Sequence, residues 1–260
     1  MRMFKLNHPT AIVSSAALLL AGGVALQASE LDNRIETSAK NSYNFKTYLK
    51  DDSIKVASSE GVVTLTGTVS FEYHKLLAQE TVSGLPGVKD VKNQLTVIGD
   101  QPADRSDGWV TMKVKTVLAF HKNVSATDTD VTTTNGVVTL SGKADSQAQK
   151  DLTGEYAKDV DGALEVRNNL VVDRPAKGMV KAHRTMGEKV DDASITAQIK
   201  TTLLFRKSTH AMATKVTTKD GVVTLNGEAR NAAERDLVTK VAEDIDGVTR
   251  VHNKMTVKKS

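Results

Sequence analysis

The sequence predicts an α+β protein built from three tandem small units, each a three-stranded mixed sheet with two helices on one face. The first observation is a heptapeptide, Gly-Val-Val-Thr-Leu-x-Gly, which occupies residues 61–67, 136–142 and 221–227. The second is that a phenylalanine, a glycine and an asparagine recur at fixed distances from each copy. Offsets that hold three times over about fifty residues indicate one duplicated domain rather than shared composition.

These repeats set the expected domain boundaries. The units are predicted at residues 30–98, 106–173 and 191–258, with residues 1–28 ahead of them and a basic linker at 174–190. A unit of about seventy residues is small for a core of its own, so we expect modest stability per unit or help from packing between units. The repeat-defining glycines are Gly61, Gly67, Gly87, Gly136, Gly142, Gly162, Gly221, Gly227 and Gly247. The matching residues are Phe45, Phe120, Phe205, Asn93, Asn168 and Asn253.

The first element of each unit is predicted to be an amphipathic helix, at residues 30–50 in the first copy. Apolar residues recur there at spacings near three and four, as they do before the other two heptapeptides. The repeated phenylalanine lies on this stripe and is expected to be a core side chain. Suitable N-caps are Asp32 or Asn33, Asp107, and Asp191 or Asp192.

A β-hairpin is predicted next. β-branched residues alternate with polar ones before each heptapeptide, which favours a strand. The turns Glu60-Gly61, Asn135-Gly136 and Asp220-Gly221 are typical of type I′ hairpins, in which both central residues have positive φ. The second strand is Val62 to Val69, and its Gly67 indicates a bulge or a close helix crossing.

A second helix and a last strand complete the unit. Residues 71–83 return to helical spacing, and Gly87 is expected to end the helix. The last strand alternates cleanly around Asn93, and a right-handed crossover should place it parallel to the second strand. Thr64 and Thr66 are expected on the open face of the sheet, while Val63 and Leu65 are expected not to face the same way, which leaves the register uncertain.

The composition argues against several functional classes. The chain has no cysteine, which excludes disulfides, thiolate nucleophiles and Cys-based zinc sites. Its histidines are not repeated between units, and no paired carboxylates or serine-hydrolase motif stand out, so no catalytic residue, metal ligand or cofactor site is assigned. Ten aromatics are too few to suggest base stacking on nucleic acid. We therefore expect a binding protein rather than an enzyme.

The N-terminus predicts export. Arg2 and Lys5 precede an apolar run from Ala11 to Ala25, and Leu26-Gln27-Ala28 follows. That order is typical of a secretory signal peptide cleaved after Ala28, which predicts a periplasmic protein. The alternative is a membrane anchor, although the run falls short of the ~20 residues that span a bilayer.

Charge is unevenly distributed along the chain. Residues 30–100 carry 8 basic and 10 acidic residues and residues 101–173 carry 8 and 11, whereas residues 191–260 carry 12 and 9. The linker adds 5 basic residues and 1 acidic one, and it is interpreted as flexible or as a stretch that lies on an anionic membrane. The candidate lipid-binding residues are Arg206, Lys207, Arg235, Lys254, Lys258 and Lys259; ordinary solvated surface is the alternative.

The repeated unit resembles the BON domain. The resemblance rests on Asp-Gly-Val-Val-Thr-Leu-x-Gly at residues 220–227 and on Gly-Val-x-x-Val-x-Asn-x-x-x-Val at residues 247–257. The other copies depart from it only at Glu60, Asn135 and Ala163. The resemblance implies a periplasmic, osmotic-stress-linked protein that contacts phospholipid membranes, or in some members a chaperone-like protein, and it brings no catalytic residues.

Two hypotheses follow. The first is a non-enzymatic periplasmic protein that contacts anionic phospholipid. The second is a chaperone-like or adaptor protein that binds other exported proteins through open sheet faces or edges. A purely structural repeat protein is a third. The sequence leaves open whether the units pack together.

Overall fold

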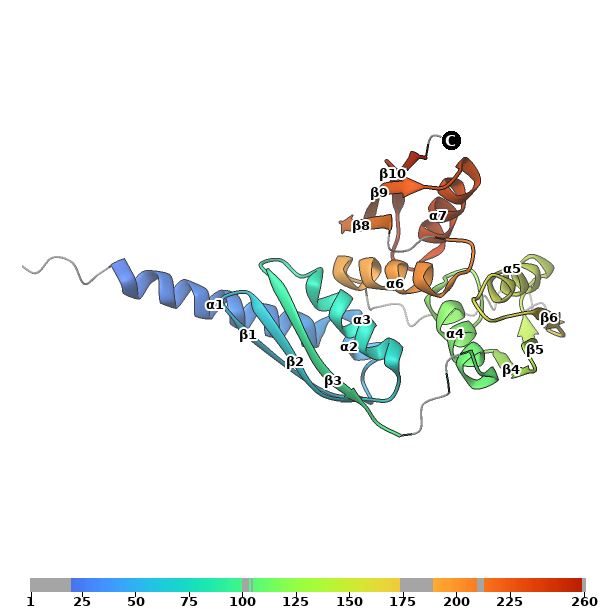
Figure 1. The fold of residues 1–260 in the computed structure, drawn as a ribbon, viewed down its shortest axis with the longest axis horizontal. Coiled ribbons are helices and arrows are strands. Elements are labelled where there is room, and N and C mark those ends of the chain that lie inside the picture. Colours follow the sequence, from blue (N-terminus) through green and yellow to red (C-terminus); the bar gives the residue numbers. More distant parts are fainter. Residues whose placement is uncertain (1–19, 100–102, 104, 174–188, 210–212, 259–260) are drawn as a thin grey trace, which may run out of the picture.

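The computed structural model describes residues 20–99, 103, 105–173, 189–209 and 213–258, and it confirms the α+β architecture of three repeated units (Figure 1). Most of the predicted signal peptide, residues 1–28, and of the predicted linker, residues 174–190, lies outside these residues. Within the described part, no helix is both long and apolar enough to cross a membrane.

Units 2 and 3 have the predicted order of elements, whereas the single helix predicted at residues 30–50 of unit 1 is divided into two helices. Unit 1 contains α1 (Leu20–Asn41), α2 (Tyr43–Thr47), β1 (Ser53–Ser59), β2 (Val62–Val69), α3 (Glu72–Ser83) and β3 (Asp90–Val97). Unit 2 contains α4 (Asp107–Phe120), β4 (Thr129–Thr134), β5 (Val137–Ala144), α5 (Gln147–Lys158), β6 (Glu165–Asn168) and β7 (Val171–Val172). Unit 3 contains α6 (Asp192–Phe205), β8 (Thr214–Lys219), β9 (Val222–Ala229), α7 (Ala232–Asp244), β10 (Arg250–Asn253) and β11 (Thr256–Val257).

The sheet topology is the one predicted. In each unit the second strand is central, antiparallel to the first strand and parallel to the third. In units 2 and 3 the third strand is interrupted once, so β6 and β7, like β10 and β11, pair with the same central strand. Val63 and Leu65 are two residues apart on β2 and are both fully buried, so the expectation that they face different ways is wrong.

The hairpin turns have the predicted geometry. Glu60 and Gly61 have φ of 54° and 80°, and the equivalent pairs in units 2 and 3 are also positive at both residues. At Gly67, where φ is 115°, an added Cβ would lie 1.9 Å from the carbonyl oxygen of Ser53 on β1. The glycine is therefore required by the neighbouring strand and not by a crossing helix.

An aspartate at the start of each unit holds the hairpin turn, which corrects the predicted capping role. The N-cap of α4 is Ser106, while Asp107 accepts from the N–H groups of Asn135 and Gly136 at 2.7 and 2.8 Å. Asp192 and Asp32 bind their own turns in the same way, and Asp32 lies within α1. Asp191 is the N-cap of α6, one of the two alternatives predicted there.

The repeated asparagine ties the third strand to the second helix. Asn93 Nδ2 donates to the carbonyl oxygen of Lys75 at 3.0 Å, and its Oδ1 accepts from the N–H of Leu95 at 3.1 Å. The equivalent pairs of bonds are present at Asn168 and Asn253. The prediction that the repeated glycine ends this helix is wrong in detail. α3 ends at Ser83, and Gly87, with φ of 91°, lies in the turn beyond it and packs against Leu31.

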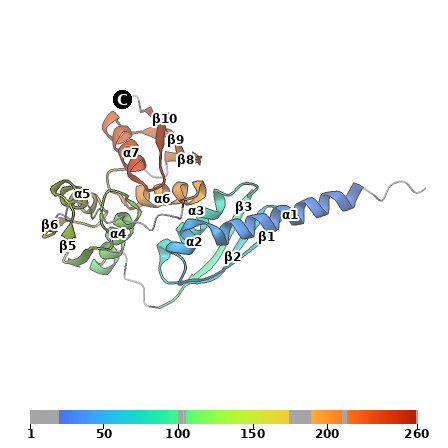
Figure 2. The same cartoon turned by 180° about the vertical axis from the view of Figure 1, so that it is seen from behind.

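The three units pack together through the first helix of unit 3. In both views α6 lies between α3 of unit 1 and α4 of unit 2 (Figure 1, Figure 2). Asn44 of unit 1 donates from its backbone to Ser194 of α6 at 3.1 Å, and Gln198 of α6 donates to the Asn44 side chain at 2.8 Å. The apolar cores of units 1 and 3 are continuous, which supplies the inter-unit support that such small domains need.

The repeated phenylalanine is buried mainly between units rather than inside its own. Phe120 of unit 2 belongs to the core shared by units 1 and 3, and it makes an edge contact with Tyr48 at 4.9 Å between ring centroids. Phe205 of unit 3 belongs to the core of unit 2. The predicted burial is therefore confirmed for these two, while Phe45 is only half-buried. The helical spacing predicted that the repeated phenylalanine is buried. It did not predict which unit buries it.

Units 2 and 3 pair reciprocally, as expected of an approximate two-fold relation. His121 forms an antiparallel bridge with Ile245, and Arg206, its repeat equivalent, forms one with Val160. The N–H of Lys122 donates to the carbonyl oxygen of Asp244 at 3.0 Å. The repeat-equivalent bond runs from Lys207 to Asp159 at 2.9 Å. A second such pair joins Asp161 to Phe205 and Asp246 to Phe120.

Unit 1 lacks the groups for this pairing. Gly84 stands where units 2 and 3 have Asp159 and Asp244, so it has no carboxylate. Pro86 stands where they have Asp161 and Asp246, so it has no N–H to donate. Unit 1 instead packs its helix α3 against α6.

Candidate functional site: a groove where the three units meet

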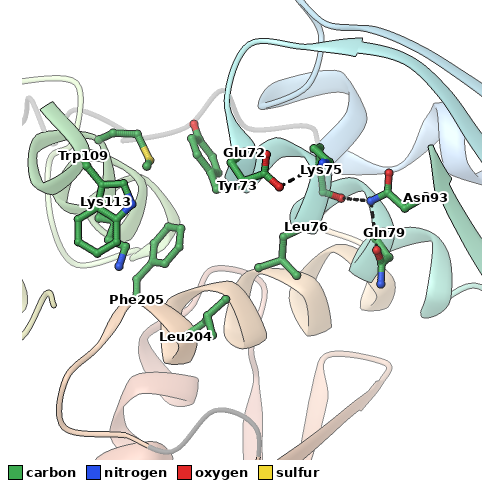
Figure 3. Close-up of a pocket in the computed structure, with 11 residues that line it drawn as sticks. Glu72, Tyr73, Lys75, Leu76, Gln79, Asn93, Trp109, Lys113, Leu204 and Phe205 are labelled. Carbon is green, nitrogen blue, oxygen red and sulfur yellow. Dashed lines mark hydrogen bonds and ion pairs between the residues drawn. The ribbon is translucent and has the colours of Figure 1, made fainter. Parts of the chain in front are cut away.

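A groove of about 840 Å³ opens at the junction of the three units (Figure 3). α3 and β3 of unit 1 form one wall, α4 of unit 2 the other, and the end of α6 of unit 3 the floor. Leu76 of α3 and Leu204 of α6 point toward one another across it. The lining residues are Glu72, Tyr73, Lys75, Leu76, Gln79, Asn93, Trp109, Met112, Lys113, Leu204 and Phe205.

The unit 2 wall holds a lysine between aromatic rings. Lys113 Nζ lies 3.2 Å from the ring centroid of Trp109 and 5.1 Å from that of Phe205. The side chain is 8% exposed, and its ammonium lies 3.4 Å from Asp161 Oδ2. Cation–π attraction compensates the partial loss of water around this charge. The groove therefore has a positive charge fixed in an otherwise apolar wall.

The unit 1 wall adds a second lysine and an aromatic ring. Lys75 pairs with Glu72 at 3.2 Å and retains a partly exposed side chain. Tyr73 makes an edge contact with Phe205 at 6.2 Å between centroids, and burial raises the pKa of its phenol. The polar side chain of Asn93 is engaged by the third-strand bonds described above and by Gln79 at 3.1 Å. This wall thus presents one ammonium beside mainly apolar surface.

Chemically, this arrangement is suited to binding. Two ammonium groups flank aromatic and aliphatic side chains, and the lining contains no nucleophile beside a base. In the described residues no cluster of His, Asp or Glu could hold a metal ion. An apolar concavity with few polar groups is the usual form of a small-molecule site. The sequence did not predict the groove, because its walls come from three different units.

The predicted lipid-binding residues are scattered, and one expectation is corrected. Arg206 is 6% exposed, and its Nε lies 2.7 Å from Asp159 Oδ2 in the interface between units 2 and 3. It therefore cannot contribute to a lipid-facing surface. Lys207 is exposed but lies at the same interface, with Nζ 3.3 Å from the carbonyl oxygen of Ala163. Lys259 lies outside the described residues.

The remaining predicted cations lie on unit 3. Arg235 is on α7, and its carbonyl oxygen accepts from Asn253 at 2.9 Å; Lys254, the next residue, lies in the break between β10 and β11. Lys254 and Lys258 are exposed, and Arg235 is partly exposed. Arg235, Lys254 and Lys258 are called the unit 3 basic group below.

Sequence reasoning missed a buried polar cluster between units 2 and 3. The ring of His121 stacks on Tyr156 at 3.9 Å between centroids, and its Nδ1 lies 3.3 Å from Asp244 Oδ2. The Tyr156 hydroxyl and the Asn123 amide both donate to Asp244. Burial lowers the pKa of His121, and burial together with Asp244 raises that of Tyr156. The available signal was that the position of His121 is basic in every unit, as Lys46 and Arg206.

Comparison with known proteins gives a consistent result. The family model described as the BON domain matches residues 31–99, 106–174 and 191–259. The chain is 37% identical over 152 residues to osmotically-inducible protein Y of Escherichia coli, covering 58% of this chain and 73% of that protein. It is 27% identical over 146 residues to the outer membrane lipoprotein DolP of Haemophilus influenzae, covering 55% and 74%. It is also 32% identical over 122 residues to a 21 kDa hemolysin of Actinobacillus pleuropneumoniae, covering 45% and 62%.

Proposed function

The chain belongs to the BON domain family, and from this we propose that it is a non-enzymatic periplasmic protein that contacts anionic phospholipid surfaces of the envelope. Two relatives support an envelope role linked to osmotic stress, since one is named as osmotically inducible and another as an outer membrane lipoprotein. The signal-peptide pattern of residues 1–28 supports export. The sequence has no cysteine, so the lipid attachment of a lipoprotein does not carry over.

The observation that carries this proposal is the unit 3 basic group. Its three cations are at least partly exposed, and they lie on the unit in which basic residues outnumber acidic ones. A basic residue near an anionic membrane contributes roughly 1 kcal/mol, so three would give weak binding on the order of 3 kcal/mol. Such binding is screened by salt and should fade as ionic strength rises.

Liposome flotation tests the proposal. The mature chain is mixed with vesicles of neutral lipid alone or with a third of anionic phosphatidylglycerol, at low and at high salt. We expect flotation only with anionic vesicles at low salt. The triple variant Arg235→Glu, Lys254→Glu, Lys258→Glu should lose it.

A matched control reverses the same number of charges on unit 2, at Lys143, Lys150 and Arg167. These residues are at least partly exposed, and Lys150 is the repeat equivalent of Arg235. We expect this control to float like the unchanged protein. Equal loss in both triple variants would show that only overall charge matters, and undiminished flotation of the unit 3 variant would refute the proposed surface.

A second candidate is a chaperone-like or adaptor protein that binds other exported proteins. The observation that favours it is exposed apolar surface on unit 2, where Leu164 and Val171 are 81% and 64% exposed. Suppression of the aggregation of an unfolded exported protein, unchanged by salt and reduced by Leu164→Asp with Val171→Asp, would support this role. Full suppression by that double variant would count against it.

A further inference from the structure

We propose that the groove at the junction of the three units binds a single-chain anionic amphiphile, an alkyl chain that carries one carboxylate or phosphate headgroup. This site is separate from the unit 3 basic group and does not depend on the proposed membrane contact. The alkyl chain would lie along Leu76, Leu204 and Trp109, and the headgroup would lie beside Lys75 at the unit 1 end of the groove (Figure 3).

The size and the exposed apolar surface of the groove support a small amphiphile. Its volume of about 840 Å³ falls within the roughly 300–1,000 Å³ usual for small-molecule sites. Leu204 is 47% exposed, although most of α6 is buried. Leu204, Leu76 and Trp109 together offer apolar contact from all three units. An alkyl chain would remove this surface from water.

The walls favour an alkyl chain over a peptide. They come almost wholly from helices α3, α4 and α6, whose backbone N–H and C=O groups bond within the helix. The one strand residue, Asn93, already uses its amide on Lys75, Gln79 and Leu95. An extended peptide would leave its own backbone groups unpaired against such walls, which is costly, whereas methylene groups need no partner.

The charges favour an anionic headgroup. Lys113 is held in the aromatic wall and Lys75 is partly exposed at the side of the groove. Glu72, the partner of Lys75, has a side chain that is 70% exposed and can turn into solvent. Lys113 is already paired with Asp161, so the preference for an anion rests on the ammonium of Lys75. Charge-assisted bonds to lysine are among the stronger polar contacts.

The copies diverge where they line the groove. Trp109 corresponds to Arg34 in unit 1 and Ser194 in unit 3, and Lys113 corresponds to Ser38 and Gln198. Neither residue is part of the repeated pattern that builds the fold, so their presence on α4 is not explained by the architecture of a unit. The site exists only when all three units are assembled.

Tryptophan fluorescence of the full chain gives a direct test, because Trp109 is the only tryptophan. We expect 11-bromoundecanoate to quench Trp109 saturably, and dodecanoate to displace it. Binding should tighten about fourfold per added methylene until the groove is filled. Dodecanol should bind more weakly, and dodecyltrimethylammonium more weakly still. Parallel titrations with dodecanoate and an anionic lysophospholipid distinguish a free fatty acid from a lipid-derived source.

Paired variants distinguish binding in the groove from nonspecific hydrophobic binding elsewhere on the protein. Leu204→Asp should weaken dodecanoate binding at least tenfold, whereas Leu164→Asp, another exposed leucine, should not. Lys75→Glu should lower the preference for dodecanoate over dodecanol, whereas Lys150→Glu, its repeat equivalent, should leave it. Lys75 is partly exposed, so its variant remains informative if Leu204→Asp does not fold.

Three results would overturn the proposal. The first is quenching by 11-bromoundecanoate no stronger than by free bromide. The second is equal binding of anionic and cationic chains. The third is equal loss in the groove variants and their controls. Reversal of the unit 3 basic group should leave dodecanoate binding intact, so the amphiphile site and the membrane surface can fail independently.

Discussion

His121 and Arg206 hold equivalent positions in units 2 and 3, and each faces an aspartate of the other unit. His121 Nδ1 lies 3.3 Å from Asp244, and Arg206 Nε lies 2.7 Å from Asp159. Tyr156 lies between them, stacked on His121 at 3.9 Å and 5.5 Å from the guanidinium carbon of Arg206. The reciprocal backbone bonds are alike on both sides, but only one side contains a histidine, the residue whose ordinary pKa lies nearest to neutral.

Stability should fall on mild acidification because of His121. Burial lowers its pKa despite the nearby Asp244 carboxylate, so the unfolded chain takes up a proton near the ordinary value of about 6.5 while the folded chain does so only at lower pH. Protons therefore favour unfolding as pH drops below about 6.5, until the lower folded pKa is passed. His74, whose pKa burial also lowers, acts in the same direction. Urea midpoints at pH 7 and pH 5 measure the effect.

Replacing both histidines should flatten this pH dependence. The double variant His74→Gln, His121→Gln should lose most of the difference between the two midpoints. His252→Gln, at an exposed histidine, should keep it. An unchanged slope in the double variant would contradict the assignment.

The turn aspartates should stabilise each hairpin. Asp107→Ala removes the acceptor of two turn N–H groups, and charged hydrogen bonds of this kind are worth about 1.5–3 kcal/mol. Urea unfolding at pH 7 should show a loss of that size, whereas Asp130→Ala, at an exposed strand residue, should change little. For Asp32, hydrogen bonds from Ser58 and then from Gly61 lower the pKa, so its contribution persists at pH 4 and is lost as pH falls further.

The inter-unit phenylalanines should be costly to remove. Phe120→Ala and Phe205→Ala should each reduce the free energy of unfolding by about 3–5 kcal/mol, because both rings are buried in the core of a neighbouring unit. Phe45→Ala should cost less, since that ring is half-buried. Denaturant unfolding compares the three variants. Equal costs at all three positions would mean that each ring serves only its own unit.

The asparagine brace can be tested with adjacent residues. Asn168→Ala removes the bonds to the carbonyl of Lys150 and the N–H of Leu170 and should cost about 1–3 kcal/mol. Asn169 is exposed, and its N–H donation to Leu140 does not need its side chain, so Asn169→Ala should be nearly neutral. A cost at Asn169 as large as that at Asn168 would argue against the brace.

The sequence predicted the fold of a unit well, because period, turn glycines and repeats all act locally. The sequence was a less reliable guide where the same residue type can make either of two different contacts. An aspartate before a helix can cap it or bind a distant turn, and Asp107 does the second. An apolar stripe shows that Phe205 is buried, but not that unit 2 buries it.

The groove and the buried polar cluster could not be predicted, because both depend on how the three units pack against one another. The repeated pattern describes each unit alone and carries no information on that packing. Trp109 and Phe205 meet only because α6 lies across the other two units. The charge pattern alone placed Arg206 on a surface, whereas pairing of units 2 and 3 buries it. Differences between copies were the missed signal, since Pro86 and Gly84 already marked unit 1 as unable to make that pairing.

A chain of three similar domains can mispair while it folds, because each domain could pack against either of the others or against a domain of a second molecule. Unit 1 cannot take part in the reciprocal pairing that joins units 2 and 3. Pro86 has no amide hydrogen to donate, and Gly84 has no carboxylate. Only one productive match is left, and the open-ended chains of domains that interchangeable copies would permit are disfavoured.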